Sequence, residues 1–497
     1  MDFITLLTVI AFLLIAVNIS SKDKNPWVML CGIGLLGIAI VSRLFGGGGF
    51  FETVIPLFTD VGLSLLAAAG WMALRKARAN SQPFFMLGLL ALGVAGLLYL
   101  GTRILGVGNN TQQASFLLEL GPDDRIEEVA PLLRQYGATF EEAFPTIPLE
   151  ADEDLAQTYL IYGDPASFDD LMAALRADAE NVDFVELNVT VSLSPPMESG
   201  ATASATREFL ENDPRVAEQW GLEAIRGHEA HALLSELKPV RKARVAIVDT
   251  GVDQKHEDVK DAFRESPGTM DVNGHGTHCA GIAGAVTNNR LGVASLNWNG
   301  DFVEVMGYKA LGDNGSGSLE SIAQAIIDAA KDKADVISMS LGAAAPTQPR
   351  VLVKAIAFAL RQGAIVVASS GNRNQDAYNH FPSNIKGVIA VAAVDQNLNK
   401  ARFSNTVNRL SRPLAAPGVD ILSLFPNNTY KSLSGTSMAT PMVTGLLSVM
   451  RSLNPKLTAE QAYTILHETG TTVADSPQVG RVINAEAAIL AALALHP

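Results

Sequence analysis

Cysteine and positive charge are both scarce in this sequence of 497 residues. The two cysteines, Cys31 and Cys279, fall in unrelated contexts and are not expected to pair, so the fold must be stable without disulfides. Lysine and arginine number 37 against 51 acidic residues, which gives a formal net charge of −14 and argues against nucleic acid as a partner. A helical His-Glu-x-x-His motif is also missing, which argues against metal catalysis of that kind.

Three polar residues, Asp249, His275 and Ser437, each stand in a context that suits a catalytic group. Asp249 closes the apolar run 243–248, which is typical of a strand buried on both faces. His275 begins a stretch of small residues that continues into an alanine-rich helix. Ser437 precedes the apolar run 442–450, so its hydroxyl is expected near a helix N-terminus, where free N–H groups stabilise an oxyanion. The trio predicts a hydrolase, although His275 and His278, three apart, could instead bind a metal.

The segment 434–441, Ser-Gly-Thr-Ser-Met-Ala-Thr-Pro, is the most specific of these motifs, because a random chain rarely places Gly, Ser and Pro at such offsets. The three segments together resemble the subtilisin-like serine proteases, the subtilases of peptidase family S8, from about Asn212 to about Ala492. The resemblance implies peptide-bond hydrolysis through an Asp249-His275-Ser437 triad and an acyl-enzyme.

The resemblance implies further site residues. The run 363–372 ends in Gly-Asn and is similar to the segment that carries the family's oxyanion-hole asparagine, which would make Asn372 a donor to the tetrahedral intermediate. Two edges that pair with an extended substrate, and one wall of the primary pocket, are implied at the following residues: Gly315, Ser316, Gly317; Ser340, Leu341, Gly342; and Ala368, Ser369, Ser370, Gly371. Ordinary turns would account equally for Gly315 and Gly317. No cofactor is required for the chemistry, and Ca²⁺ is implied as a structural ion near Asp258 and Asn288.

Four apolar stretches precede residue 107, and each approaches or exceeds the length of a membrane-spanning helix. They are Phe3–Ile19, Trp27–Phe45, Val54–Leu74 and Phe84–Leu105. Basic residues follow the first and third stretches, which places those loops in the cytoplasm and the rest of the chain on the extracytoplasmic side. The sequence therefore predicts a multi-pass region over residues 1–107 that contacts the lipid bilayer. The first stretch is the shortest and could instead lie in the membrane interface.

Residues 114–193 alternate strand-like and helix-like runs and predict a small α+β module. Its position before the catalytic region resembles the inhibitory propeptide of subtilases, the I9 type, which would make the module a partner of its own protease. A generic spacer domain is the alternative. Residues 194–211 have the composition of a linker and are expected to contain a self-cleavage site.

Residues 212–497 alternate buried strands with helices, which predicts a doubly wound parallel α/β sheet of the subtilisin type. The expected strands are Ala243–Val248, Val303–Ala310, Val336–Leu341, Ala364–Ser369 and Gly387–Val394, and the expected helices are Ser318–Lys333, Val351–Arg361, Met438–Ser452 and Ala459–His467. The whole chain is thus expected to be a membrane-anchored, self-processing serine endopeptidase that acts on proteins or peptides. A membrane sensor or scaffold whose protease acts only in cis, or on a single partner, is the alternative.

Overall fold

The computed structural model describes residues 115–193, 197–198, 209–264 and 270–495. The chain divides into two units, residues 1–113 and 114–497, and every described residue belongs to the second. The four predicted membrane spans lie within residues 1–107, outside the described residues. Among the described helices, none combines the length and the hydropathy needed to cross a bilayer.

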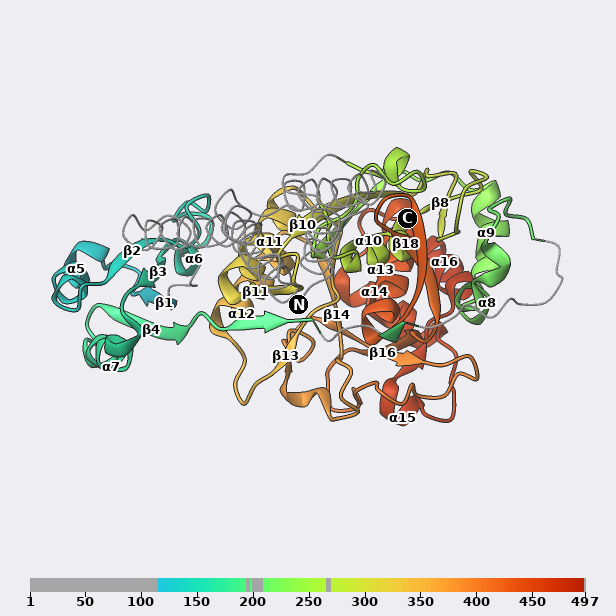
Figure 1. The fold of residues 1–497 in the computed structure, drawn as a ribbon. Helices are drawn as coiled ribbons and strands as arrows, with labels where there is room; N and C mark the ends of the chain where they lie inside the picture. The colour runs from blue at the N-terminus through green and yellow to red at the C-terminus, as the bar shows by residue number, and fades with distance from the viewer. Residues whose placement is uncertain (1–114, 194–196, 199–208, 265–269, 496–497) are drawn as a thin grey trace, which may run out of the picture. The chain divides into compact units, whose positions relative to one another are not determined.

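Seven parallel strands form the central sheet (Figure 1), in the spatial order β10-β7-β12-β14-β16-β17-β20. Their bounds are β7 Ala243–Asp249, β10 Val303–Lys309, β12 Val336–Met339, β14 Ile365–Ser369, β16 Ile389–Val394, β17 Pro413–Pro417 and β20 Arg481–Val482. The first five confirm the predicted strands, whereas β17 and β20 were not predicted. The chain runs from β7 to β10 on one side and returns to β12 on the other, so the strand order reverses at β7, where a crevice is expected at the carboxyl ends.

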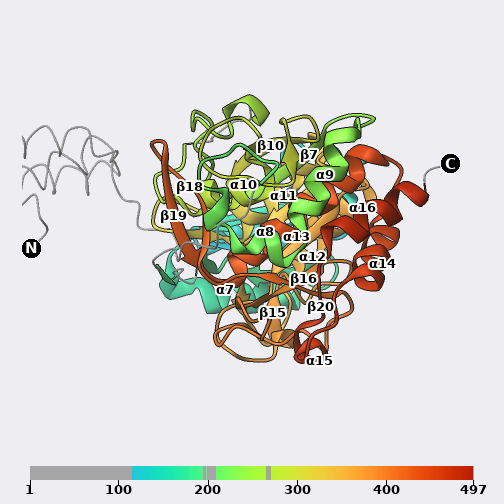
Figure 2. The same ribbon diagram turned by 90° about the vertical axis from the view of Figure 1, so that its right-hand side faces the viewer.

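Helices cover both faces of this sheet, which confirms the doubly wound architecture. On one face lie α11 (Leu319–Lys331) and α12 (Arg350–Arg361); on the other lie α9 (Gly227–Glu236), α10 (His275–Gly284), α13 (Thr436–Leu453), α14 (Ala459–Thr469) and α16 (Ala485–Ala494). Figure 2 shows α9, α14 and α16 gathered beside α13.

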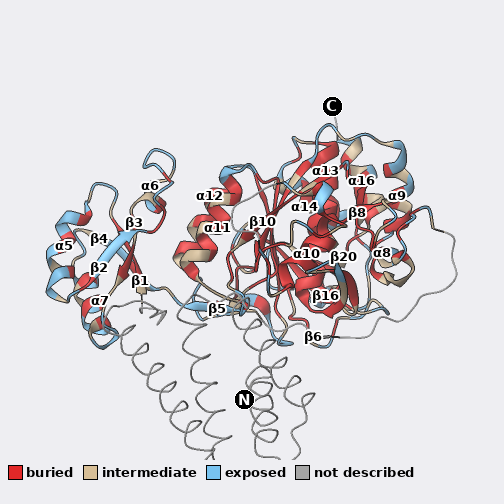
Figure 3. Ribbon diagram, turned by 45° about the horizontal axis from the view of Figure 1, so that its top comes forward, coloured by how far each residue is buried: buried red, intermediate tan, exposed pale blue. Residues whose placement is uncertain are grey.

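The strands feed two separate cores because successive side chains of a strand point to opposite faces. In β7, Val245 and Ile247 pack into the core that contains α10 and α13, whereas Ala246 and Val248 pack into the core that contains α11 and α12. Every residue of α13 is buried, and this helix and the central strands form the red interior of Figure 3. A continuous apolar run such as 243–248 therefore reflects burial on both faces of the sheet.

The N-terminal module, residues 115–193, has its own antiparallel sheet in the order β2-β3-β1-β4 and its own hydrophobic core. Its elements are β1 Ser115–Leu120, α5 Ile126–Gln135, β2 Thr139–Glu142, α6 Glu153–Ala156, β3 Thr158–Tyr162, α7 Phe168–Ala177 and β4 Val182–Leu187. The last part of the module contains two strands, β4 and β5, because β5 (Thr190–Ser192) leaves the module's sheet after Asn188 and Val189 and pairs with β11 (Ser316–Ser318).

The remaining short elements belong to the catalytic region, except for β6, which lies in the linker. They are α8 Trp220–Ala224, α15 Ser476–Val479, β6 Met197–Glu198, β8 Val286–Thr287, β9 Asn297–Trp298, β13 Ala343–Ala344, β15 His380–Phe381, β18 Ile421–Phe425 and β19 Thr429–Ser434. The hairpin of β18 and β19 leads directly into α13, and β6 adds to its outer strand.

Candidate active site

Asp249 is the last residue of β7 and is fully buried. Its Oδ1 accepts a hydrogen bond from the backbone N–H of Thr250 at 2.7 Å, while Oδ2 has no partner among the described residues. The carboxylate therefore sits at the carboxyl end of a central strand beside the point where the strand order reverses, which is where ligands bind in open α/β sheets.

His275 is the first residue of α10 and is also buried. Its Nδ1 lies 2.7 Å from Oδ1 of Asp249, and the ring is the donor because a carboxylate only accepts. Burial by itself lowers the pKa of His275, but the Asp249 carboxylate, their hydrogen bond and nearby Asp271 outweigh burial, so the pKa is raised. The other ring nitrogen, Nε2, has no partner among the described residues and remains available to exchange a proton.

Asp271 was not identified in the sequence, although it fixes the position of this pair. Its Oδ1 accepts hydrogen bonds from Thr250 Oγ1 at 2.9 Å and from the N–H of Gly274 at 2.8 Å. Its Oδ2 accepts from the N–H and the hydroxyl of Thr277 in the first turn of α10. The signal in the sequence is an aspartate just before a helix that begins Gly-His-Gly-Thr, a position where a side chain can satisfy free N–H groups.

Ser437 is the second residue of α13, as the sequence predicted from its position before an apolar run. Its hydroxyl donates to the carbonyl of Ser340 at 3.2 Å, so its proton is not directed to His275 in this structure. The Ser340 hydroxyl donates in turn to the Ser437 carbonyl at 2.8 Å, and buried Cys279 donates to the same carbonyl at 3.4 Å. These contacts join the start of α13 to the end of β12 and to α10.

Asn372 follows β14 and is bound to the same helix start. Its Oδ1 accepts hydrogen bonds from the N–H of Thr436 at 2.9 Å and from the Thr436 hydroxyl at 2.8 Å. Because both donors occupy the carbonyl oxygen, the side-chain NH₂ group is directed elsewhere, and an added Cβ on Gly435 would lie 3.3 Å from Nδ2. Asn372 is thus held by Thr436, the residue that directly precedes Ser437 in α13.

The first predicted substrate edge, Gly315 to Gly317, is already paired with another part of the chain. Strand β11 pairs antiparallel with β5 of the module, with Ser316 opposite Ser192 and Gly317 opposite Val191. The N–H of Leu193 extends this pairing by donating to the Gly315 carbonyl at 2.8 Å. This is the main-chain hydrogen bonding by which a sheet edge takes up an extended peptide.

The other predicted substrate positions lie at the ends of neighbouring strands. Ser340, Leu341 and Gly342 connect β12 to β13, while Ala368 and Ser369 end β14, and Ser370 and Gly371 follow it. The Ser369 hydroxyl donates to the Leu341 carbonyl at 3.5 Å, so the two groups are neighbours. Ser340 and Asn372 both form hydrogen bonds with residues at the start of α13. The backbone N–H of Gly371 donates to the hydroxyl of Thr436 in the same helix turn at 3.2 Å.

The two residues predicted near a calcium ion, Asp258 and Asn288, have different side-chain partners. Buried Asp258 accepts a hydrogen bond from the side chain of Asn289 at 2.8 Å, whereas the side chain of Asn288 donates to Asn299 at 3.0 Å. Asn288, whose backbone is left-handed with φ 65°, directs its side chain to Asn299 and not to Asp258. Asp213, missed in the sequence, accepts from the N–H of Asn288 at 2.8 Å and of Asn289 at 3.3 Å.

Comparison with known proteins identifies the family of this chain. The profile of the subtilase family, Peptidase S8, matches residues 241–482. The curated M-protease of Shouchella clausii (strain KSM-K16) is 34% identical over 311 residues, which cover 60% of this chain and 78% of that protein. The chain belongs to the subtilase family.

Two further relatives support the assignment. Thermitase of Thermoactinomyces vulgaris is 38% identical to this subtilase over 252 residues, 49% of the chain and 86% of the relative. Subtilisin Savinase of Lederbergia lenta is 36% identical over 275 residues, 54% of the chain and 97% of the relative. The subtilase described here is accordingly a serine endopeptidase that acts on proteins or peptides.

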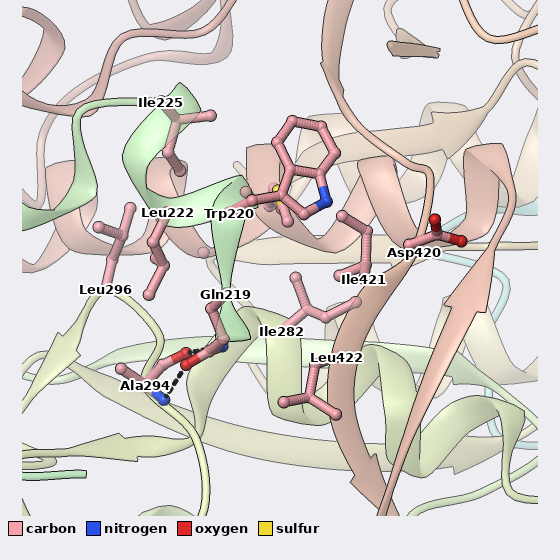
Figure 4. Close-up of a pocket in the computed structure, with 13 residues that line it drawn as sticks. Gln219, Trp220, Leu222, Ile225, Ile282, Ala294, Leu296, Asp420, Ile421 and Leu422 are labelled. Atoms are coloured by element: carbon pink, nitrogen blue, oxygen red, sulfur yellow. Dashed lines mark hydrogen bonds between the residues drawn. The ribbon is translucent and has the colours of Figure 1, made fainter. Parts of the chain in front are cut away.

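A separate apolar pocket lies between α8, β18 and α13 (Figure 4). Trp220, Leu222 and Ile421 line it together with Met442 of α13. The side chain of Gln219 closes one side by bonding both the N–H and the carbonyl of Ala294, at 2.7 and 2.8 Å. None of the predicted site residues lines this pocket, so it is distinct from the candidate active site of the subtilase.

Proposed function

We propose that Ser437 is the nucleophile, His275 the general base and Asp249 the group that orients the imidazole. The buried Asp249–His275 hydrogen bond of 2.7 Å supports this assignment most strongly, because it occupies Nδ1 of His275 and leaves Nε2 of the same ring free to accept a proton. Ser437 turns from the Ser340 carbonyl toward Nε2, gives its proton to the ring and attacks the substrate carbonyl. His275 then protonates the leaving amine, and water hydrolyses the acyl-enzyme.

Asn372 and the backbone N–H of Ser437 are proposed to bind the oxyanion of the tetrahedral intermediate. Thr436 fixes the Asn372 amide through its carbonyl oxygen, so the NH₂ group is preorganised before the charge develops. The position of Ser437 in the first turn of α13 adds the positive end of the helix dipole.

We further propose that residues 114–193 form a propeptide that inhibits the protease in cis. Its strand β5 pairs with the edge Ser316–Ser318, which in an active enzyme would receive the substrate main chain. Val191 is 1% exposed and packs in one core with Leu311 and Leu319. The module therefore also buries a side chain against the catalytic region, as a bound substrate would. The resemblance to an I9 propeptide and this pairing support the same proposal.

Charge complementarity adds to the pairing of the module with the catalytic region. The Glu186 carboxylate accepts the N–H groups of Arg350 and Val351 at 2.9 and 2.7 Å, which caps the start of α12. Glu119 forms ion pairs with Arg350 at 2.9 Å and with Lys354. Acidic residues of the module thus bind the N-terminal half of a helix in the catalytic region.

Proline in the linker is expected to limit self-cleavage to a few bonds. After Leu193 the sequence reads Ser194-Pro195-Pro196, and pairing resumes where Met197 of β6 lies opposite Ser434 of β19. The rigid pyrrolidine ring and the missing N–H of proline make the Ser194–Pro195 and Pro195–Pro196 bonds poor substrates. We propose cleavage at Leu193–Ser194, at Pro196–Met197 or further into residues 194–211, which would separate residues 212–497 as the catalytic domain.

We propose that residues 1–107 anchor the chain in the membrane through four helices, with the protease on the extracytoplasmic side. The apolar lengths and the distribution of basic residues in the sequence support this topology. Alkaline phosphatase fused at residue 110 would be active in this topology, and an inactive fusion would contradict it.

A structural Ca²⁺ is proposed near Asp258, Asp213 and Asn289, which offer the oxygen ligands that the ion prefers. Burial raises the pKa of Asp258 to about 6, only partly offset by hydrogen bonds from Val293 and Asn289, and Asp213 raises it further. A bound cation would neutralise the negative charge of these two buried carboxylates.

Mass spectrometry of the full chain beside its Ser437→Ala variant tests the proposed activity. We expect fragments separated within residues 194–211 in the wild type and an intact chain in the variant. The same fragments from Ser437→Ala would rule out self-processing. Cleavage of the chain without turnover of added peptides would instead favour a protease that acts only in cis, the alternative that the occupied edge at β11 supports.

A further inference from the structure

A second cluster of metal-ligating side chains lies outside the catalytic triad, at the start of the described catalytic region. His228 and His231 are three apart on α9, and Glu211 reaches them from the segment before α8. All three are buried, with side chains that are 7%, 0% and 0% exposed. One donor atom from each residue lies within 4.8 Å of the other two.

Hydrogen bonding within the cluster is incomplete. Nδ1 of His228 lies 2.8 Å from Oε1 of Glu211, and Nδ1 of His231 contacts the same oxygen. The other carboxylate oxygen, Oε2, is buried without a partner among the described residues. A buried carboxylate oxygen without a partner costs free energy, so the site lacks a positively charged or donating group.

His231 shows where that group belongs. Its Nε2 lies 2.6 Å from the carbonyl of Ser295, which can only accept, so a neutral ring carries its proton on Nε2. The lone pair of Nδ1 then faces Oε1 of Glu211, and two lone pairs repel unless a cation lies between them. The imidazole–carbonyl contact is the one that orients a metal-binding histidine and fixes its tautomer.

We propose that Glu211, His228 and His231 bind one divalent transition-metal ion of the Zn²⁺ class. Two imidazole nitrogens and a carboxylate form a donor set that suits Zn²⁺ or Co²⁺ better than Ca²⁺, and Oε2 completes four ligands when the carboxylate binds through both oxygens. Bonds of about 2.1 Å at near-tetrahedral angles place a histidine nitrogen and a carboxylate oxygen about 3.4 Å apart. The 2.8 Å contact of His228 with Glu211 would therefore lengthen by about 0.6 Å, and the shorter contact of His231 by more.

The ion would fasten the first segment of the catalytic region to its core. Glu211 is the last residue of the linker, whereas α9 packs against α16, and the His231 ring lies against that of Trp298, tilted by 37° with centroids 5.5 Å apart. The ring of Phe209 contacts that of His228, with centroids 5.0 Å apart. The site is therefore a structural clamp on residues 209–213 and does not depend on the proposed proteolysis.

Titration with Co²⁺ tests the site, using the full chain in a Ser437→Ala background that prevents self-digestion. Metal is first removed with a chelator, Ca²⁺ is added to saturate oxygen-ligand sites, and the d–d absorption of four-coordinate Co²⁺ is followed together with metal content by mass spectrometry. We expect one tightly bound Co²⁺ per chain, displaced by Zn²⁺. Affinity should fall at least tenfold in Glu211→Gln and in His228→Gln.

Two control variants distinguish this site from other histidines. His467→Gln changes an exposed histidine of α14, and His275→Gln removes the imidazole of the Asp249, His275 and Cys279 group; both should retain the ion. A Ser437→Ala chain with Glu211, His228 and His231 intact that binds no Co²⁺ or Zn²⁺ would overturn the proposal, whether or not the further variants fold, and would leave a cluster neutralised by a proton. Unchanged stoichiometry and affinity in folded Glu211→Gln would overturn it as well.

Discussion

Replacement of Glu186 by alanine is expected to expose the active site of the full-length chain. The carboxylate accepts two N–H groups at the start of α12, from Arg350 at 2.9 Å and Val351 at 2.7 Å. Hydrogen bonds to a charged group contribute about 1.5–3 kcal/mol each. Burial raises the pKa of Glu186 in spite of these bonds, which means that desolvation offsets part of the gain.

We therefore expect a net loss of about 2 kcal/mol in docking free energy, below the sum for two such bonds. At 1.4 kcal/mol per factor of ten, the undocked fraction rises about 30-fold. Because β5 pairs with the proposed substrate edge at Ser316–Ser318, the initial rate at which a fluorophosphonate labels Ser437 should rise by the same factor.

The matched control is Glu180→Ala, which removes the same charge from an exposed position of the same module. It should label at the wild-type rate. Equal rates for Glu186→Ala and the wild type, with both chains folded by circular dichroism, would refute the argument that docking of the module masks the serine.

Three further predictions concern the catalytic region. In the processed enzyme, kcat/KM should fall as the pH drops through a pKa of His275 raised above its ordinary 6.5, because only the neutral ring accepts a proton; a midpoint below 6.5 would contradict this. Asn372→Ala should lower kcat about 100-fold or more with little change in KM, and a loss confined to KM would remove it from the oxyanion hole. Gly371→Ala should cost about 1–3 kcal/mol in thermal unfolding, since φ is +98° and the new Cβ would lie 2.6 Å from Asn405 Nδ2. Gly363→Ala, with φ +89° and no atom within 4 Å, should cost less, and equal costs would rule out the steric explanation.

The parallel sheet was largely predictable because its strands are apolar on both faces and bounded by polar residues. Strand β7 and helix α13 follow from composition over a few residues, and the same local patterns place Asp249 at a strand end and Ser437 in a first helical turn. Strand β20, with only two residues, has no such pattern, and it forms where it pairs with β17 and with Thr471.

Side-chain direction was not predictable. Asn288 and Asn289 are identical in type and adjacent, yet Asn289 bonds Asp258 while Asn288, with a left-handed φ, bonds Asn299. The cluster of Glu211, His228 and His231 also escaped the sequence, because the acid comes from a segment that precedes the helix and meets it only after the chain has folded.

The sequence by itself determined the type of enzyme and predicted the residues proposed for its triad, because each of those residues stands in a short motif that its neighbours define. Tertiary structure alone decided which of them meet. Asp249 and His275 come within 2.7 Å through the packing of α10 against β7, while the hydroxyl of Ser437 is directed to Ser340. It also decided that β5 pairs with β11, the proposed substrate edge, since pairing between residues more than a hundred positions apart depends on the whole fold.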